Sequence, residues 1–473
     1  MRCALPETPP LISSTDSSQP SDFDTLNPVH IAGTKGKGST SSLISSILSQ
    51  YLPTKRSIHA ERLPSNVGLY TSPHLRFVRE RIQIDNKPIS EELFAKCFWE
   101  LWDRLESSSP LHPTVTNGVP RSGTGKPVYF HYLTLMALHC YVEQQVGTAV
   151  IECGIGGEYD TTNIFSKPSV TGVTSLGIDH QSLLGDTIES IAWHKAGIFK
   201  PDVPAFTTPQ PDGAMRVLND RAKERGTKLE IVHPHPAIET INLGLQGDFQ
   251  RVNASLAVAV SAAHLQELGY TGIPSPLDQS SPLPDEFVTG LEKARLGGRC
   301  DKRPDRKLGN LTWYLDGGHT LESIEMAGRW FASTAGARST KILIFNQQTR
   351  DASALAQRLH STLASALVDS NPFKHAIFCT NTTYKDAGYK PDLVSINTNK
   401  DDVGSLRVQR ELAETWDGID PAADVSVLGT IEEAIARARD VAGQGEEVEV
   451  LVTGSLHLVG GCIEVLEGGD GTG

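Results

Sequence analysis

Residues 29–40 read VHIAGTKGKGST. The first four residues predict a buried strand, and Ser39 marks the expected start of a helix. Glycines between them let backbone N–H groups turn toward a phosphate, the helix N-terminus adds partial positive charge, and Lys37 adds a full one. An ordinary glycine-rich turn is the alternative, but lysines beside glycines at a strand-to-helix junction favour a nucleotide phosphate loop. The spacing differs from the Walker motif, since a glycine stands between Lys37 and Ser39.

From this loop outward, short apolar runs alternate with longer helical patterns. Strands are expected at 67–70, 148–153 and 170–176, and helices at 39–52, 90–105, 129–145 and around Ile188 and Ala214. The alternation resumes after Arg299, with strands expected at 311–318, 340–346, 375–379 and 449–455 and helices at 321–333, 352–367 and 431–441. Such alternation is typical of α/β folds, in which helices cover a mostly parallel sheet.

The length of 473 residues suits more than one domain, at roughly 100 to 200 residues each. We expect two α/β domains, at residues 29–297 and 298–473. The preceding residues 1–28 are rich in Ser, Pro and Asp and contain little apolar material, so a disordered tail is expected there.

Composition excludes several classes of protein. The net charge of −13 argues against a protein whose main role is to bind nucleic acid, because phosphate binding needs clustered Lys and Arg. No apolar stretch approaches the roughly 18 residues of a membrane span. The seven cysteines are scattered, with no C-x-x-C pair, which is typical of free thiols in a reducing compartment. With no signal-peptide pattern at the N-terminus, we expect a cytoplasmic protein, and a mitochondrial pool stays open.

Polar residues follow several of the predicted strands. Glu152 ends a buried strand, where open α/β sheets bind ligands, and a carboxylate there is a natural Mg²⁺ ligand. It could instead cap a turn or pair with a surface lysine. His180 ends the next strand segment and could share a metal with Glu152. Lys195, at a helix end, could meet a phosphate or be modified, although a solvated lysine is commoner. Asp316 and His319 repeat this arrangement in the second domain.

Taken together, these segments resemble the folylpolyglutamate synthase family of the Mur ligase superfamily, which contains ATP-dependent amide-forming ligases. The resemblance covers residues 29–461 and is carried by AGTKGKGST (32–40), GLYTSPHL (68–75), ECGIGGEYDTTN (152–163), TSLGIDH (174–180), YLDGGHTLES (314–323) and VTGSLHLVGG (452–461). It implies a Mur-ligase-like N-terminal P-loop ATPase domain with a parallel-rich sheet, a C-terminal Rossmann-like domain, and an active site in the cleft between them.

The implied reaction transfers the γ-phosphoryl group of ATP to the glutamate γ-carboxylate of a reduced folate. The amino group of incoming L-glutamate then attacks the acyl phosphate, and ADP and phosphate leave. A carboxylate is a poor acyl acceptor because its leaving group would be oxide, and phosphorylation removes that obstacle. The implied partners are therefore reduced folates, L-glutamate and ATP, and we expect a monomer.

The resemblance also assigns roles to residues. It implies ATP contacts from Gly33, Thr34, Lys35, Gly36, Lys37, Gly38, Ser39, Thr40, Asn253, Arg299, Asp316 and His319. It implies one Mg²⁺ on Ser39 and Glu152 and a second on Ser72, Glu152 and His180, and a monovalent cation such as K⁺ is considered beside them. The expected catalytic residues are Lys37, Glu152, His180 and Lys195, and Lys195 matches a lysine that is carbamylated in some members of the family.

The sequence departs from the family at a few places. Residues 295–299 read RLGGR where a Trp-Pro-Gly-Arg approach to the nucleotide arginine is usual, and residues 52–66 and 107–126 resemble insertions. A dihydrofolate synthase is the closest rival, but its loop tends to carry Asn at the position of Lys35, which favours the folylpolyglutamate enzyme. A nucleotide-gated switch or an inactive relative with the same fold is the alternative from another class.

Overall fold

The computed structural model describes residues 20–52, 66–107, 115–116, 119–120, 126–348, 351–385 and 405–468. The chain forms two compact units. Unit 2 begins at Leu296 and also takes in Leu75–Val78 and Leu245–Asp248, and unit 1 takes the rest. Both units are α/β with parallel-rich sheets, which confirms the predicted fold class. The expected functional boundary after residue 297 stays a prediction.

Unit 1 is organised around an eight-stranded sheet. Its order is β10 (Leu229–Ile231), β9 (Ala205–Thr207), β8 (Val170–Val173), β1 (Val29–Ala32), β7 (Thr148–Glu152), β2 (Val67–Tyr70), β3 (Ile82–Ile84) and β4 (Lys87–Pro88). The six strands from β10 to β2 are parallel, whereas β2–β3 and β3–β4 pair antiparallel. The carboxyl ends of β8, β1, β7 and β2 therefore meet at one edge of the sheet.

The position of β1 explains its composition. It lies between β7 and β8, and all four of its residues are buried. Strands that are covered on both faces by helices read as nearly continuous apolar runs rather than alternating ones. In the sheet register, Ile31 stands opposite Glu152 on one side and Gly172 on the other. The phosphate loop consequently leaves the sheet next to the end of β7.

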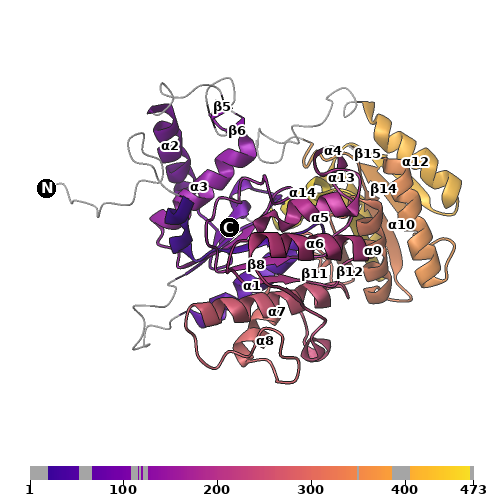
Figure 1. Ribbon diagram of the computed structural model, residues 1–473. Coiled ribbons are helices and arrows are strands. Elements are labelled where there is room, and N and C mark those ends of the chain that lie inside the picture. The colour runs from indigo at the N-terminus through magenta and orange to yellow at the C-terminus, as the bar shows by residue number, and fades with distance from the viewer. Residues whose placement is uncertain are drawn as a thin grey trace. The chain divides into compact units, whose positions relative to one another are not determined.

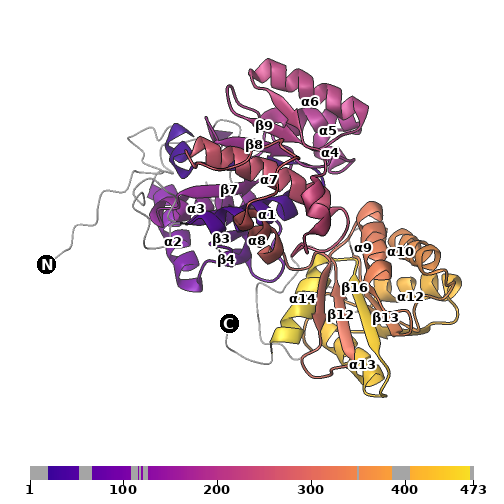
Figure 2. The same ribbon diagram turned by 90° about the horizontal axis from the view of Figure 1, so that it is seen from below.

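The helix that follows β1 lies among small residues. Helix α1 (Lys37–Leu48) packs against α7 (Gln250–Glu267) and α8 (Asp285–Lys293), and the three lie together in Figures 1 and 2. A Cβ added to Gly290 would lie 2.5 Å from the Ile47 Cα, and the Ser46 hydroxyl donates to the Gly290 carbonyl at 2.7 Å. Serine and glycine thus permit a close approach that larger side chains would prevent.

The other helices of unit 1 pack in pairs. Helices α2 (Glu91–Ser107) and α3 (Tyr129–Glu143) contact one another, as do α5 (Ile188–Lys195) and α6 (Asp212–Arg225), with the one-turn α4 (Gln181–Leu184) ahead of α5 (Figure 1). Short 3-10 helices are η1 (Pro20–Leu26), η2 (Ser49–Tyr51), η3 (Val78–Arg81), η5 (Ala196–Ile198) and η6 (Pro236–Thr240).

Unit 2 contains a six-stranded sheet. Its order is β11 (Asp301–Pro304), β12 (Leu311–Leu315), β16 (Val448–Thr453), β13 (Thr340–Phe345), β14 (His375–Cys379) and β15 (Asp424–Leu428), and only β11 is antiparallel to its neighbour. Helices α9 (Leu321–Thr334), α10 (Ala352–Leu367) and α12 (Arg407–Ile419) lie on one face, and α13 (Ile431–Ala442) and α14 (Leu456–Glu467) on the other (Figure 2).

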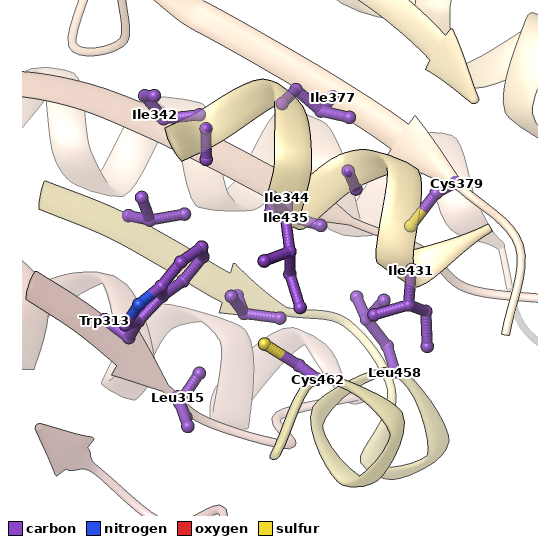
Figure 3. Close-up of a cluster of buried hydrophobic side chains, with 14 of the residues drawn as sticks. Trp313, Leu315, Ile342, Ile344, Ile377, Cys379, Ile431, Ile435, Leu458 and Cys462 are labelled. Carbon is purple, nitrogen blue, oxygen red and sulfur yellow. The ribbon is translucent and has the colours of Figure 1, made fainter. Parts of the chain in front are cut away.

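The core of unit 2 lies between its sheet and α13 and α14. Figure 3 shows Trp313, Ile344 and Ile377 from the strands facing Ile435 and Leu458 from these two helices. All five side chains are at most 1% exposed. Burial of such side chains contributes about 1.5 to 3 kcal/mol each relative to exposure.

The structure corrects one sequence expectation and adds to others. Part of the tail expected over residues 1–28 is ordered, because η1 buries Phe23 and Leu26. Helix α7 was not singled out from sequence, since residues on nearly all its faces are buried and it lacks a clear polar stripe. The suggested insertions at 52–66 and 107–126 fall mostly outside the described residues, apart from the short hairpin of β5 (Val115–Thr116) and β6 (Val119–Pro120).

Two expectations from composition can be compared with the structure. The six described cysteines are free and buried, as the scattered spacing predicts. Among the described residues, no helix has both the length and the apolar character needed to cross a bilayer.

Candidate active site

The phosphate loop joins β1 to α1 by way of two glycines in conformations that other residues rarely adopt. Gly33 has φ +147° and Gly36 has φ +86°. A Cβ on Gly33 would lie 1.8 Å from the Thr174 Oγ1, and one on Gly36 would lie 2.2 Å from the Asn253 Oδ1. The glycines therefore serve both the turn and the close approach of β8 and α7.

The start of α1 is arranged to receive an anion. Gly36 is its N-cap and provides no side-chain acceptor, and the first helical hydrogen bond runs from the Thr40 N–H to the Gly36 carbonyl at 2.8 Å. The N–H groups of Lys37, Gly38 and Ser39 precede that bond and have no acceptor within the helix. Together with the helix dipole, they suit a phosphate group.

The first part of the loop is held by the end of β8. The N–H groups of Thr34 and Lys35 both donate to the Ser175 carbonyl, at 3.1 and 3.0 Å. The Lys35 ammonium lies 3.8 Å from the carboxylate of Asp179. The backbone N–H groups of Thr34 and Lys35 therefore fix the shape of the loop by bonding to Ser175 rather than facing a phosphate.

A second lysine lies beneath the loop. Lys195, at the end of α5, is 2% exposed, and its ammonium donates to the Gly33 carbonyl at 2.7 Å. Burial and the nearby charge of Lys37 lower the pKa of Lys195 to about 7. A fraction of Lys195 is therefore neutral near physiological pH, in the form that can act as a nucleophile.

Glu152 lies where the sequence predicts it, at the carboxyl end of β7. It is 3% exposed, and its Oε2 accepts a hydrogen bond from the Ser72 N–H at 2.9 Å. Because Ser72 follows β2, this bond joins two neighbouring strand ends at the edge that also carries the phosphate loop. Two predicted metal ligands are thereby brought together.

The glycine-rich loop after Glu152 is fixed by Asp160. Its carboxylate accepts from the N–H groups of Ile155 at 2.7 Å and Thr162 at 2.9 Å, and from the Thr162 hydroxyl at 2.6 Å. A Cβ on Gly157 would lie 2.6 Å from the His194 carbonyl, so the loop rests directly on the end of α5. Asp160 therefore indirectly positions both Glu152 and Lys195.

His180 lies at the same edge in a different setting. It is the N-cap of α4, with φ 52°, and its side chain is exposed. Its backbone N–H donates at 2.9 Å to the carboxylate of Asp179, the residue that pairs with Lys35. His180 is thus linked to Lys35 of the phosphate loop by way of its neighbour Asp179. Its expected contact with a metal stays a prediction.

Helix α7 contributes a residue that sequence reasoning missed. Gln250 is fully buried, and its Nε2 donates to the Ser39 hydroxyl at 3.2 Å, while its Oε1 accepts from Asn253 at 2.8 Å. Asn253, a predicted nucleotide contact, therefore reaches the loop near Gly36. The spacing of Gln250 and Asn253 could have indicated this contact, because polar residues at i and i+3 on a helix lie on one face.

Oxygen atoms dominate this edge of the sheet. The hydroxyls of Thr40 and Thr174 are buried and have no hydrogen-bond partner among the described residues. These hydroxyls, the Ser39 hydroxyl and the Glu152 carboxylate are hard oxygen donors on segments at this sheet edge, and Mg²⁺ prefers such donors. The residues present therefore fit a magnesium–nucleotide site.

The predicted nucleotide contacts of unit 2 form a cluster of their own. Asp316 follows β12, and its carboxylate accepts from the N–H groups of Cys300 and Gly318, both at 2.9 Å. Burial raises the pKa of Asp316, and the charge of Arg299 opposes that shift. His319 is held through its Nδ1, 2.9 Å from the Gly317 carbonyl. Arg299, Asp316 and His319 are thus neighbours at one strand end of unit 2.

Comparison with known proteins identifies the family of the chain. The chain is 45% identical over 456 residues to folylpolyglutamate synthase of Neurospora crassa, which covers 95% of this chain and 83% of that protein. The chain belongs to the folylpolyglutamate synthase family. The protein of the same name from Saccharomyces cerevisiae strain AWRI796 is 45% identical over 450 residues, covering 94% of this chain and 78% of the relative.

Solved structures of the family share the fold. Folylpolyglutamate synthase of Mycobacterium tuberculosis complexed with ADP has a TM-score of 0.68 at 21% identity, covering 94% of this chain and 91% of that one. The enzyme from Thermotoga maritima has a TM-score of 0.67 at 23% identity, covering 95% and 93%. No protein-family model matches the chain.

Proposed function

We propose that this chain is an ATP-dependent ligase that adds L-glutamate to the γ-carboxylate of a reduced folate. The observation that carries the proposal is the open N-terminus of α1 beside the buried Glu152, in a chain 45% identical to named folylpolyglutamate synthases. A phosphate site and a buried carboxylate at one sheet edge are what phosphoryl transfer from a nucleotide requires.

Lys37 and the first N–H groups of α1 bind the β- and γ-phosphates in this proposal. They hold the γ-phosphoryl group in line with the folate carboxylate and neutralise the charge that spreads over its oxygens. The carboxylate oxygen attacks phosphorus, ADP leaves, and the resulting acyl phosphate is attacked by the glutamate amine, which expels inorganic phosphate and loses a proton.

Ser39 and Glu152 would hold one Mg²⁺, and Ser72, Glu152 and His180 a second. Magnesium supplies charge neutralisation on the phosphates when it is bound. The Ser72–Glu152 hydrogen bond orients the carboxylate, and Gln250 orients the Ser39 hydroxyl. Asn253, Arg299, Asp316 and His319 are proposed to complete the nucleotide site.

Lys195 is proposed to carry a carbamate. A neutral amine adds to CO₂ and releases one proton, and burial keeps part of Lys195 neutral near pH 7 because its pKa is lowered to about 7. In ¹³C-bicarbonate, a carbamate resonance is expected in the wild type and absent from Lys195→Met. A wild-type spectrum without that resonance would refute the modification.

The main test uses Lys37→Ala and Glu152→Gln. Each variant is expected to lower the rate of ADP release that depends on folate and glutamate together by at least about 100-fold. Lys37→Ala removes a positive charge that neutralises the transferring phosphoryl group, and Glu152→Gln removes a carboxylate proposed to hold Mg²⁺. Lys223→Ala, at an exposed lysine of α6, is the matched control and should keep wild-type turnover. Near-normal turnover in a folded Lys37→Ala or Glu152→Gln would contradict the assigned roles.

The alternatives make different predictions in the same assay. A dihydrofolate synthase would incorporate labelled glutamate into dihydropteroate rather than tetrahydrofolate. A nucleotide switch would release ADP at a rate that neither folate nor glutamate changes, and an inactive relative would release none. The names of the similar proteins favour the folylpolyglutamate reaction.

A further inference from the structure

Away from the nucleotide site, three metal-ligating side chains meet between two helices of unit 1. Cys97 and Glu100 lie on α2, and His139 lies on α3. The Cys97 Sγ, a Glu100 carboxylate oxygen and a ring nitrogen of His139 all lie within 4.8 Å of one another. Helices α2 and α3 contact one another and are side by side in both views (Figures 1 and 2).

The spacing along α2 explains part of this convergence. Residues at i and i+3 lie on one face of a helix, so Cys97 and Glu100 point toward the same neighbour. That neighbour is the buried part of α3, where His139 is 2% exposed, and Cys97 is fully buried. Helical bundles often build metal sites from such i, i+3 pairs on facing helices.

We propose that Cys97, Glu100 and His139 bind a Zn²⁺ ion. Thiolate, imidazole and carboxylate are the three protein ligand types that zinc takes in tetrahedral sites, and a water molecule would fill the fourth position. Hard ions such as Mg²⁺ or Ca²⁺ avoid thiolate, so the donor set selects against them. The thiolate and the carboxylate together neutralise the charge of the ion.

The nitrogen and oxygen ligands require a small adjustment. The His139 Nε2 and Glu100 Oε2 are 2.9 Å apart, at hydrogen-bonding distance. A tetrahedral zinc about 2.0 Å from each would separate them to about 3.3 Å. An opening of roughly 0.4 Å, well within the freedom of a partly exposed glutamate, converts the hydrogen bond into a pair of ligands.

The surrounding residues support the ligands. The Lys96 ammonium lies 3.7 Å from the other carboxylate oxygen of Glu100, and 3.5 Å from the carboxylate of Glu143, so Glu100 keeps Oε2 for the metal. The thiol of Cys140 neighbours Cys97 and lowers the pKa of the Cys97 thiol. A thiol that donates to a ligating sulfur acts as an outer-shell partner, which fixes the orientation of the ligand.

The first experiment measures uptake by the reduced, full-length protein after removal of metal with a chelator. With Mg²⁺ and ADP present to occupy the nucleotide site, one Zn²⁺ per chain should bind and release one proton from the Cys97 thiol. Cobalt in place of zinc should give a thiolate-to-metal charge-transfer band and the visible spectrum of a tetrahedral ion. No uptake by the folded wild type would overturn the proposal and leave an ordinary His–Glu hydrogen bond.

Variants then assign the site. Cys97→Ser, His139→Asn and Glu100→Gln should each weaken zinc binding by more than about 100-fold, and Cys140→Ala by only about 10-fold. Glu100→Gln keeps the shape of a partly exposed side chain, so it stays informative if a variant at a buried position does not fold. His180→Asn is the control for the nucleotide site and should keep the cobalt thiolate band. Unchanged zinc affinity in Glu100→Gln and Cys97→Ser would overturn the assignment.

Discussion

Helix α1 of unit 1 begins differently from four helices of unit 2. In unit 1, α1 has Gly36 as its N-cap and no side-chain cap, and the phosphate loop joins it to the central strand β1. In unit 2, α9, α10, α13 and α14 are each capped by the side chain of their own N-cap residue, which are Thr320, Asp351, Thr430 and Ser455. Both sheets nevertheless present polar residues at the carboxyl ends of parallel strands.

The difference concerns which group satisfies the first N–H groups of a helix. A capping side chain accepts a hydrogen bond from one of these N–H groups and stabilises the helix by about 1 kcal/mol. An uncapped N-terminus leaves them for an external anion, at some cost to the stability of the empty protein. The uncapped, glycine-rich N-terminus of α1 is therefore a better sign of a phosphate site than polar residues alone.

The largest effect is expected from a substitution in the phosphate loop that obstructs the uncapped N-terminus of α1. Gly36→Ala places a Cβ 2.2 Å from the Asn253 Oδ1 and forces alanine to a positive φ, which costs about 1 to 2 kcal/mol before the clash is counted. Affinity for a non-hydrolysable ATP analogue, measured by calorimetry, should fall by about 100-fold or more. Gly309→Ala, with nothing within 4 Å of the added atom, should behave as wild type. Retained affinity in Gly36→Ala would show that the loop tolerates this change.

A smaller effect is expected from Lys195, whose contribution to the free energy of unfolding depends on pH. The pKa of Lys195 is about 7 in the folded protein and 10.5 in its ordinary state, so between these values the unfolded chain binds a proton that the folded chain lacks. Stability from this group therefore rises with pH, by up to about 1.4 kcal/mol per unit. The free energy of unfolding of wild type minus Lys195→Met, in CO₂-free buffer, should increase from about pH 7 to about pH 9. A difference that is constant with pH would contradict the lowered pKa.

The smallest effect is expected from removing a cap in unit 2. In Thr430→Ala, the Glu433 N–H loses the hydroxyl acceptor 3.1 Å away, and urea unfolding should show a loss of about 1 kcal/mol. Affinity for the ATP analogue should not change, because this N-terminus is not proposed to bind an anion. Thr430→Ser keeps the hydroxyl and serves as the control. Weaker nucleotide binding in Thr430→Ala alone would undermine the distinction between the two kinds of N-terminus.

Much of the fold followed from local patterns. The apolar run at β1, the glycines after it and the small residues of α1 each favour the observed conformation on their own. The same is true of Glu152, because a buried strand that ends in an acidic residue can place it only at the sheet edge. Helix α7 was harder, since a helix buried on most faces shows no period that distinguishes it.

The contacts across elements could not be predicted. Gln250 is 211 residues from Ser39 in the sequence, and Lys195 is 162 residues from Gly33, yet each pair is hydrogen-bonded. Local sequence sets the conformation of a segment but gives no distance to a partner so far along the chain. The lowered pKa of Lys195 depends on the same packing, because burial is the largest cause of the shift.

The sequence by itself determined the alternation of strands and helices, the phosphate loop and the family, since these depend on residue types at short spacing. Only the tertiary structure decided other contacts: Lys195 with the Gly33 carbonyl, Gln250 with Ser39, and Cys97 with Glu100 and His139. Strand order and helix packing fix those contacts, and both result from burying the hydrophobic core of each unit rather than from any local preference.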